Sequence, residues 1–147
     1  MKTLLLLVAL LVSPLLAAQD LYMVRSQLPF PEAMSMLQQS IGESGFKISR
    51  VQRVDIGLTK SGYKTDKYRI VFFGDLDELH AVSDLHPDLI PYLPLKIAIF
   101  AENGETLLLA SSFKHLRPFY TSPDLMKKFN QWESAIREIL ERVRVAE

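Results

Sequence analysis

The chain has 147 residues, of which 48% are hydrophobic and 23% are charged, and it contains no cysteine. This length suits a single domain, and the hydrophobic content excludes a disordered or collagen-like chain. Seventeen basic residues balance seventeen acidic ones, so we expect no nucleic-acid partner, because such binding normally needs excess positive charge. Without cysteine, disulfide frameworks, thiol nucleophiles and iron–sulfur clusters are excluded.

Residues 1–18 have the pattern of a secretory signal peptide. Lys2 supplies a positive charge, residues 4–16 are almost wholly aliphatic, and small residues ending in Ala18 precede a polar pair. The apolar run of about 13 residues is shorter than the roughly 20 that a membrane-spanning helix needs. We therefore expect cleavage after Ala18 and a periplasmic protein of residues 19–147 without a stable membrane span. An uncleaved anchor or a buried terminal helix is the alternative.

The next part of the chain predicts a strand, a helix, a strand and a connection. A β-prone run begins at Leu21. A helix follows, with Pro31 in its first turn and Gly45 as a left-handed stop. Residues 46–55 have the composition of a strand, and residues 57–66 that of a hairpin connection or loop.

A second group of elements follows from residue 68. Residues 68–73 have the pattern of a strand in which both faces are largely apolar. Such a pattern predicts a central strand in a sheet that is covered on both sides. Asp75 then caps a helix, and Glu78 three residues later completes a pattern like a capping box. Short turns are predicted over residues 86–94. Two β-prone runs then meet at Asn103-Gly104, which is the strongest short signal for a hairpin.

A long C-terminal helix is predicted over residues 122–144, with Ser122 as its N-cap. Its apolar residues recur in alternate steps of four and three: Leu125, Phe129, Trp132, Ile136, Ile139 and Val143. We expect this seam to cover one face of the sheet, and a homodimer contact through the seam is the alternative. The opposite face is expected to carry two i,i+4 ion pairs, Glu133–Arg137 and Glu138–Arg142.

Strands and helices that alternate in this way, partly joined by hairpins, predict an α+β fold. We expect a two-layer sandwich in which helices cover a mainly antiparallel sheet, with a long C-terminal helix. Residues 19–147 are expected to form a single domain.

One group of acidic residues and histidines suggests metal chemistry. His80 and Asp84 are four residues apart on one helical face, and Glu78 and Asp88 lie nearby. A metal-dependent enzyme that uses His80 and His86 is therefore an alternative. The spacing matches no standard zinc pattern, so we assign no metal ligand.

The same enzymatic alternative includes a hydrolase that combines His115 with Ser111 or Ser112. No G-x-S-x-G elbow surrounds these serines, and the sequence has neither a phosphate-binding P-loop nor a G-x-G-x-x-G turn. We therefore assign no catalytic residue and identify no cofactor. The second alternative is a dimeric interaction module whose final helix pairs between chains.

The favoured interpretation is a ligand-binding or accessory protein without catalysis. A basic loop, Lys114 to Arg117, precedes an aromatic stretch that ends in Tyr120, and such a loop can hold an anionic ligand. The candidate residues for binding a small or anionic molecule are His86, Tyr92, His115, Arg117 and Tyr120.

Two longer runs carry a resemblance to a known family. Residues 68–75 read YRIVFFGD and lead into the capped helix, and residues 87–100 read PDLIPYLPLKIAIF. In this order, and with the Leu93-Pro94 step, the chain resembles the domain-of-unknown-function family 302 of bacteria and archaea over Tyr22 to Ser112. The resemblance implies a small α+β fold with an antiparallel sheet and a possible dimer. It implies no activity and supplies no catalytic residues.

Overall fold

The computed structural model describes residues 20–146. The predicted signal peptide and its cleavage site therefore lie outside the described residues. Within the described range, no helix has both the length and the apolar character that a membrane span requires.

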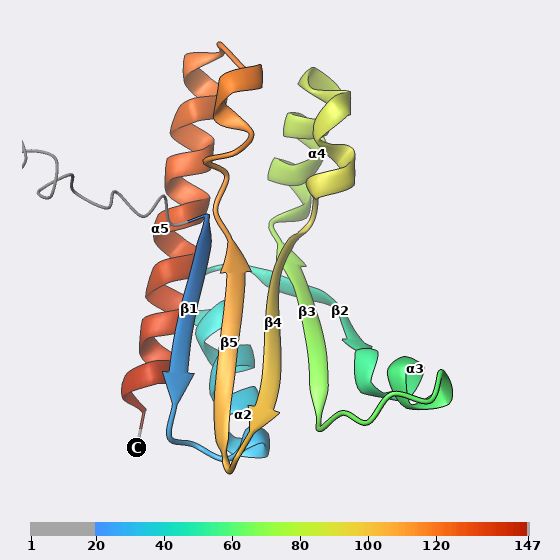
Figure 1. Ribbon diagram of the computed structural model, residues 1–147. Helices are drawn as coiled ribbons and strands as arrows, with labels where there is room; N and C mark the ends of the chain where they lie inside the picture. Colours follow the sequence, from blue (N-terminus) through green and yellow to red (C-terminus); the bar gives the residue numbers. More distant parts are fainter. Residues whose placement is uncertain (1–19, 147) are drawn as a thin grey trace, which may run out of the picture.

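Five strands form one antiparallel sheet, in the spatial order β1-β5-β4-β3-β2 (Figure 1). The strands are β1 (Leu21–Ser26), β2 (Lys47–Arg53), β3 (Tyr68–Gly74), β4 (Leu95–Glu102) and β5 (Glu105–Ser111). Asn103 and Gly104 have φ values of 52° and 85° between β4 and β5. This left-handed pair confirms the predicted tight hairpin.

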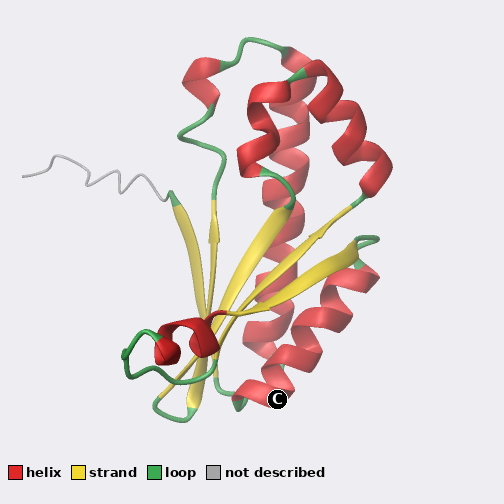
Figure 2. Ribbon diagram, turned by 90° about the vertical axis from the view of Figure 1, so that its right-hand side faces the viewer, coloured by secondary structure: helices red, strands yellow, loops and turns green. Residues whose placement is uncertain are grey.

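The helices α2 (Phe30–Glu43) and α5 (Pro123–Val145) cover one face of this sheet. The other helical elements are α4 (Leu76–Leu85), a short α3 (Val54–Lys60) and two 3₁₀ turns, η1 (Pro87–Tyr92) and η2 (Arg117–Phe119). In Figure 1 the strands lie in front of α2 and α5, and Figure 2 shows these helices on one side of the sheet. The predicted α+β fold and its long C-terminal helix are confirmed.

Local capping chemistry sets where the helices begin and end. The Asp75 side chain accepts a hydrogen bond from the Glu78 N–H at the start of α4, and Ser122 accepts one from the Leu125 N–H at the start of α5. Gly45, at a φ of 84°, follows α2 as the predicted left-handed stop.

The apolar seam of α5 packs against the sheet of its own chain. All six seam residues are buried, including Trp132 at 2% exposure and Phe129 at 0%. The seam is therefore buried within its own chain, partly against β1 and α2 and partly against Phe113 and α4, and its six residues are not exposed to a second chain.

One prediction about the exposed side of α5 is wrong. Glu133 is 6% exposed, and its carboxylate pairs with Arg117. Arg137 donates a hydrogen bond to the backbone carbonyl of Glu133 and forms no ion pair with the Glu133 carboxylate. The second predicted pair, Glu138–Arg142, is present at 2.7 Å. Glu133 is drawn inward because a segment distant in sequence supplies partners for its carboxylate.

The connection between β2 and β3 also differs from expectation. Residues 54–60 form the helix α3 rather than a strand end and a loop. The carboxylate of Asp55, in the first turn, pairs with Arg69 on β3. This tertiary contact anchors a helix of only seven residues. Because α3 contains Gly57 and has no side-chain cap, no local pattern predicted a helix there.

The prediction for residues 68–73 is confirmed in part. β3 is an internal strand, between β4 and β2. Val71 and Phe73 are fully buried beneath the helices, whereas Tyr68, Ile70 and Phe72 on the other face are only half-buried. We call this second face, opposite α2 and α5, the outer face of the sheet.

Candidate functional site

A helical cap extends beyond one end of the sheet. It consists of α4, η1, residues 112–122 and the first half of α5 (Figures 1 and 2). The ends of β3 and β5 and the starts of β2 and β4 meet this cap, because neighbouring antiparallel strands run in opposite directions. Two cavities lie where the cap meets the sheet.

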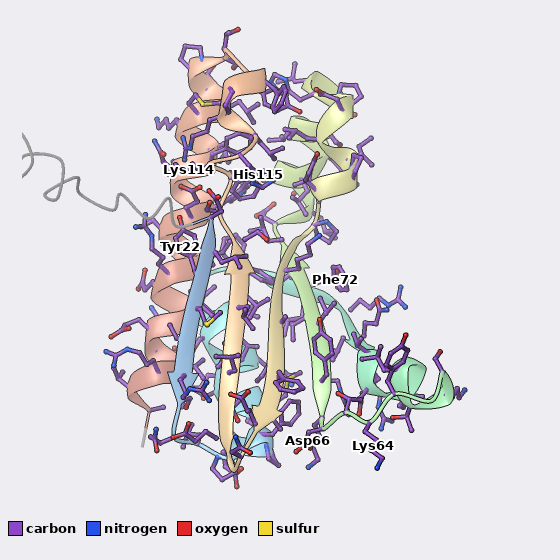
Figure 3. The ribbon with its side chains drawn as sticks, viewed as in Figure 1. Tyr22, Lys64, Asp66, Phe72, Lys114 and His115 are labelled. Atoms are coloured by element: carbon purple, nitrogen blue, oxygen red, sulfur yellow. The ribbon has the colours of Figure 1, made fainter. Side chains whose placement is uncertain are left out.

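The first cavity, which we call the His115 cavity, has a volume of about 250 Å³. It is lined by Tyr92, Leu95, Lys96, Ser111, Ser112, Phe113, His115, Leu116 and Ile136. None of these residues is acidic, while Lys96 and His115 are basic. The rings of Tyr92 and His115 lie 6.1 Å apart, and Figure 3 shows His115 just beyond the end of β5. Two of the five predicted ligand-binding residues therefore share one cavity.

His86 and Tyr120 form a second pair, which does not line this cavity. Their rings meet edge to face with centroids 5.8 Å apart. The Tyr120 hydroxyl donates a 2.8 Å hydrogen bond to Asp88 Oδ2. Desolvation, together with the adjacent Asp88 carboxylate, raises the pKa of Tyr120 to about 12. The pair joins the end of α4 to the segment that leads into α5.

Arg117, the fifth predicted ligand residue, is engaged within the chain. Its guanidinium donates to Glu133 Oε2 at 2.8 Å and to Asn130 Oδ1 at 2.9 Å. The other carboxylate oxygen of Glu133 accepts the Phe113 N–H at 2.7 Å. Glu133 thus ties both ends of residues 113–117 to α5 and fixes the segment that carries His115.

Glu133 is the residue of this site that the sequence analysis missed. Its position could have indicated this role, because Glu133 directly follows Trp132 of the buried seam. A carboxylate that is desolvated beside such a seam requires hydrogen-bond or ion-pair partners. We interpreted it instead from its spacing to Arg137 alone.

The serines of the hydrolase hypothesis line the same cavity as His115. Among the hydrogen bonds of residues 20–146, none joins His115 to Ser111 or Ser112. Ser112 Oγ instead accepts the Lys114 N–H at 3.3 Å. The arrangement therefore lacks the nucleophile–base contact of a preformed triad in the described chain.

The acidic residues near His80 do not converge with it on a metal site. Across residues 20–146, no three His, Asp or Glu side chains are grouped so that they could hold an ion. The Glu78 carboxylate instead contacts Lys128 and Trp132, and Asp88 accepts the hydroxyl of Tyr120.

The second cavity, which we call the α4 cavity, has a volume of about 420 Å³ and mostly apolar walls. It is lined by Lys47, Ile48, Ser49, Gly74, Leu76, Leu79, His80, Ser83, Ile90, Leu93 and Pro94. A Cβ on Gly74 would lie 2.5 Å from Leu79 Cδ1, so glycine allows α4 to pack closely over the end of β3. The sequence analysis did not predict this cavity, because it joins α4 to the distant start of β2.

Comparison with known families agrees with this architecture. The model of the family described as domain of unknown function DUF302 matches residues 22–143. The chain belongs to this family. A crystal structure of an uncharacterized conserved DUF302 protein from Bacillus stearothermophilus is similar, with a TM-score of 0.75 and 21% sequence identity. The similarity covers 85% of this chain and 98% of that one, and at this identity it shows the shared fold. No curated protein matches the chain.

Proposed function

We propose that this DUF302 protein is an exported, periplasmic binding protein that holds a small anion in the His115 cavity and performs no catalysis. The observation that carries this proposal is the polarity of that cavity: Lys96 and His115 line it, and none of its lining residues in the described chain is acidic. Export is supported by the charged, apolar and small-residue order of residues 1–18.

The side chains around the cavity suit a compact anion. Lys96 forms no ion pair with residues 20–146. Its ammonium, the His115 ring and the hydroxyls of Tyr92 and Ser111 supply donors for a phosphate or carboxylate. Leu95 and Ile136 also line the cavity with apolar side chains, so its polarity suits an aromatic carboxylate.

The single tryptophan provides a direct readout of this cavity. The Trp132 ring lies 5.5 Å from the ring of Phe113, which lines the cavity. We expect benzoate and inorganic phosphate, tested separately by titration, to change Trp132 fluorescence. The Lys96→Met and His115→Gln variants should each weaken that binding by about tenfold or more, since each removes a charged or polar donor.

The α4 cavity offers matched control variants. Lys47→Met and His80→Gln make the same chemical changes around the other cavity and should leave anion binding unchanged. An equal loss of anion binding in all four variants, or no binding of either anion by the wild-type protein, would overturn the proposal. Turnover of an ester that disappears in His115→Gln would replace it with the hydrolase alternative.

Export has its own test. Protein recovered from the periplasm of an expressing bacterium should begin at Gln19. Recovery in the cytosol with Met1 still present would contradict the export part of the proposal, and the anion titration would be unaffected.

The walls of the α4 cavity favour a second candidate function, the binding of an apolar ligand. Leu76 and Ile90 line it and remain 54% and 57% exposed. Its volume falls within the range of about 300–1,000 Å³ typical of small-molecule sites. Decanol should bind to the wild-type protein and to Lys96→Met. A Ser83→Trp variant, which fills the cavity, should not bind it.

A further inference from the structure

The outer face of the sheet is unusually apolar for a face that α2 and α5 leave uncovered (Figure 2). In antiparallel strands, directly paired residues point to the same face, so the register assigns each side chain to a side. The outward apolar residues are Leu21, Met23, Tyr68, Ile70, Phe72, Ala98, Phe100, Leu107 and Leu109. None of them is buried, and Leu21 and Met23 are 52% and 57% exposed. A solvated sheet face normally carries polar residues.

Charged side chains lie at the two ends of this face. Arg50 and Lys96 flank Phe72 at the end near the cap. Glu102 and Glu105 are register partners at the hairpin end, and Arg25 forms an ion pair with each of them. The cap end is therefore positive and the hairpin end carries net negative charge, with apolar residues between them.

A shallow hollow lies in the middle of the face. It has a volume of about 150 Å³ and is lined by Leu21, Ile70, Lys96, Ala98, Leu109, Ala110 and Ser111. The small side chain of Ala98, between Ile70 and Leu109, leaves this space. The large ring of Phe100 lies two residues further along the same strand.

We propose that the outer face binds a second copy of this chain, through a two-fold axis that crosses the strands at the level of Ile99. This axis places Phe100 of each copy over the Ala98 hollow of the other. The same operation sets Lys96 of one copy opposite Glu102 of the other, so the positive end meets the negative end. A two-fold axis along the strands would instead bring like charges together.

The size of the face predicts a weak, reversible dimer. Five strands about 4.8 Å apart and about six residues long give a face of roughly 24 by 20 Å. Side-chain relief increases the accessible area, so two copies would bury close to the lower end, about 1,200 Å², of standard interfaces. We expect a dissociation constant on the order of 10–100 μM.

The oligomeric state tests the use of this face. The protein purified from the periplasm should change from monomer to dimer in sedimentation equilibrium as its concentration rises through that range. Ala98→Arg places a charge in the hollow and should weaken the dimer at least about tenfold. Ala81→Arg makes the same change on the exposed surface of α4 and should leave the dimer intact. Circular dichroism and Trp132 fluorescence should show both variants folded.

A zero-length carbodiimide cross-link tests the orientation. Lys96 and Glu102 are six residues apart on one strand, about 20 Å, so an amide between them can form only between chains. We expect this cross-link in the wild-type dimer. Lys96→Arg, which keeps the charge but does not react, should lose the cross-link and still dimerise.

Three outcomes would overturn the proposal. They are a monomer at every concentration up to about 1 mM, a dimer that survives Ala98→Arg, and a dimer without the Lys96–Glu102 cross-link. A monomer that instead co-sediments with phosphatidylglycerol vesicles would assign the outer face to a lipid surface.

Discussion

The indole N–H of Trp132 donates a 2.6 Å hydrogen bond to Glu78 Oε2 and so joins α5 to α4. The other carboxylate oxygen of Glu78 contacts the Lys128 ammonium on the same face of α5. Trp132 is 2% exposed, so its N–H depends on this partner. This carboxylate therefore ties the start of α4 to α5 within the helical cap.

Removing this carboxylate should loosen the cap. Glu78→Ala leaves the indole N–H without its acceptor, and we expect a loss of about 2 kcal/mol in the free energy of unfolding. Glu78→Gln retains an acceptor and should cost less. Urea unfolding followed by Trp132 fluorescence measures both. A loss no larger than that of Asp77→Ala, at an exposed position on α4, would contradict the structural role.

Glu133 should be more sensitive than the other glutamates of α5. Glu133→Ala leaves the Phe113 N–H and the Arg117 guanidinium without their partner, at a cost of about 2–3 kcal/mol. Glu138→Ala removes only an exposed i,i+4 pair and should cost below about 0.5 kcal/mol. Chemical unfolding of the two variants makes the comparison. Because Glu133 positions the segment that carries His115, its loss should also weaken anion binding.

Tyr120 gives the protein a stability change at high pH. Its pKa is about 12 in the folded chain against an ordinary value of 10.0, so folding favours the neutral phenol. The contribution is fully present below pH 10 and is lost as the pH rises toward 12. Thermal melting should show this loss in the wild type, and Tyr120→Phe should lack that part of it. Asp88→Asn removes the adjacent carboxylate and should lower the pKa of Tyr120, as measured by ultraviolet titration.

Asp55 should act at the opposite end of the pH scale. The Arg69 guanidinium holds the pKa of this carboxyl below its usual value of 3.8. Its stabilising effect is therefore present above that value and is lost as the pH falls through the lowered folded-state pKa. Asp55→Asn should reduce the acid dependence of unfolding and speed hydrogen exchange in α3. An unchanged exchange rate in α3 would show that this pair does not hold the helix.

Lys96 connects the two proposals, because it lines the His115 cavity and lies on the outer face of the sheet. An anion in the cavity would compete with Glu102 of the second copy for the same ammonium. Since such coupling is reciprocal, benzoate should weaken dimerisation, and dilution should strengthen benzoate binding. Sedimentation in benzoate against chloride of equal ionic strength separates this effect from screening. Equal dissociation in the two salts would show that the sites are independent.

The local elements of this fold could be predicted from the sequence, because their signals involve residues a few positions apart. Asp75 and Ser122 accept hydrogen bonds from N–H groups three residues later. The Asn103-Gly104 turn depends on the φ values of two adjacent residues, and the α5 seam follows from helical periodicity. Short-range geometry therefore determined the order of the elements other than α3, and with it the α+β class.

Only the tertiary structure decided the environment of individual polar side chains. Glu133 is buried because Phe113 and Arg117, well before it in the chain, provide its partners, and α3 depends on a contact from Asp55 to Arg69. The His115 cavity likewise brings together residues from β4 and the cap. The free energy of such a site depends on desolvation and long-range partners, which no local pattern encodes.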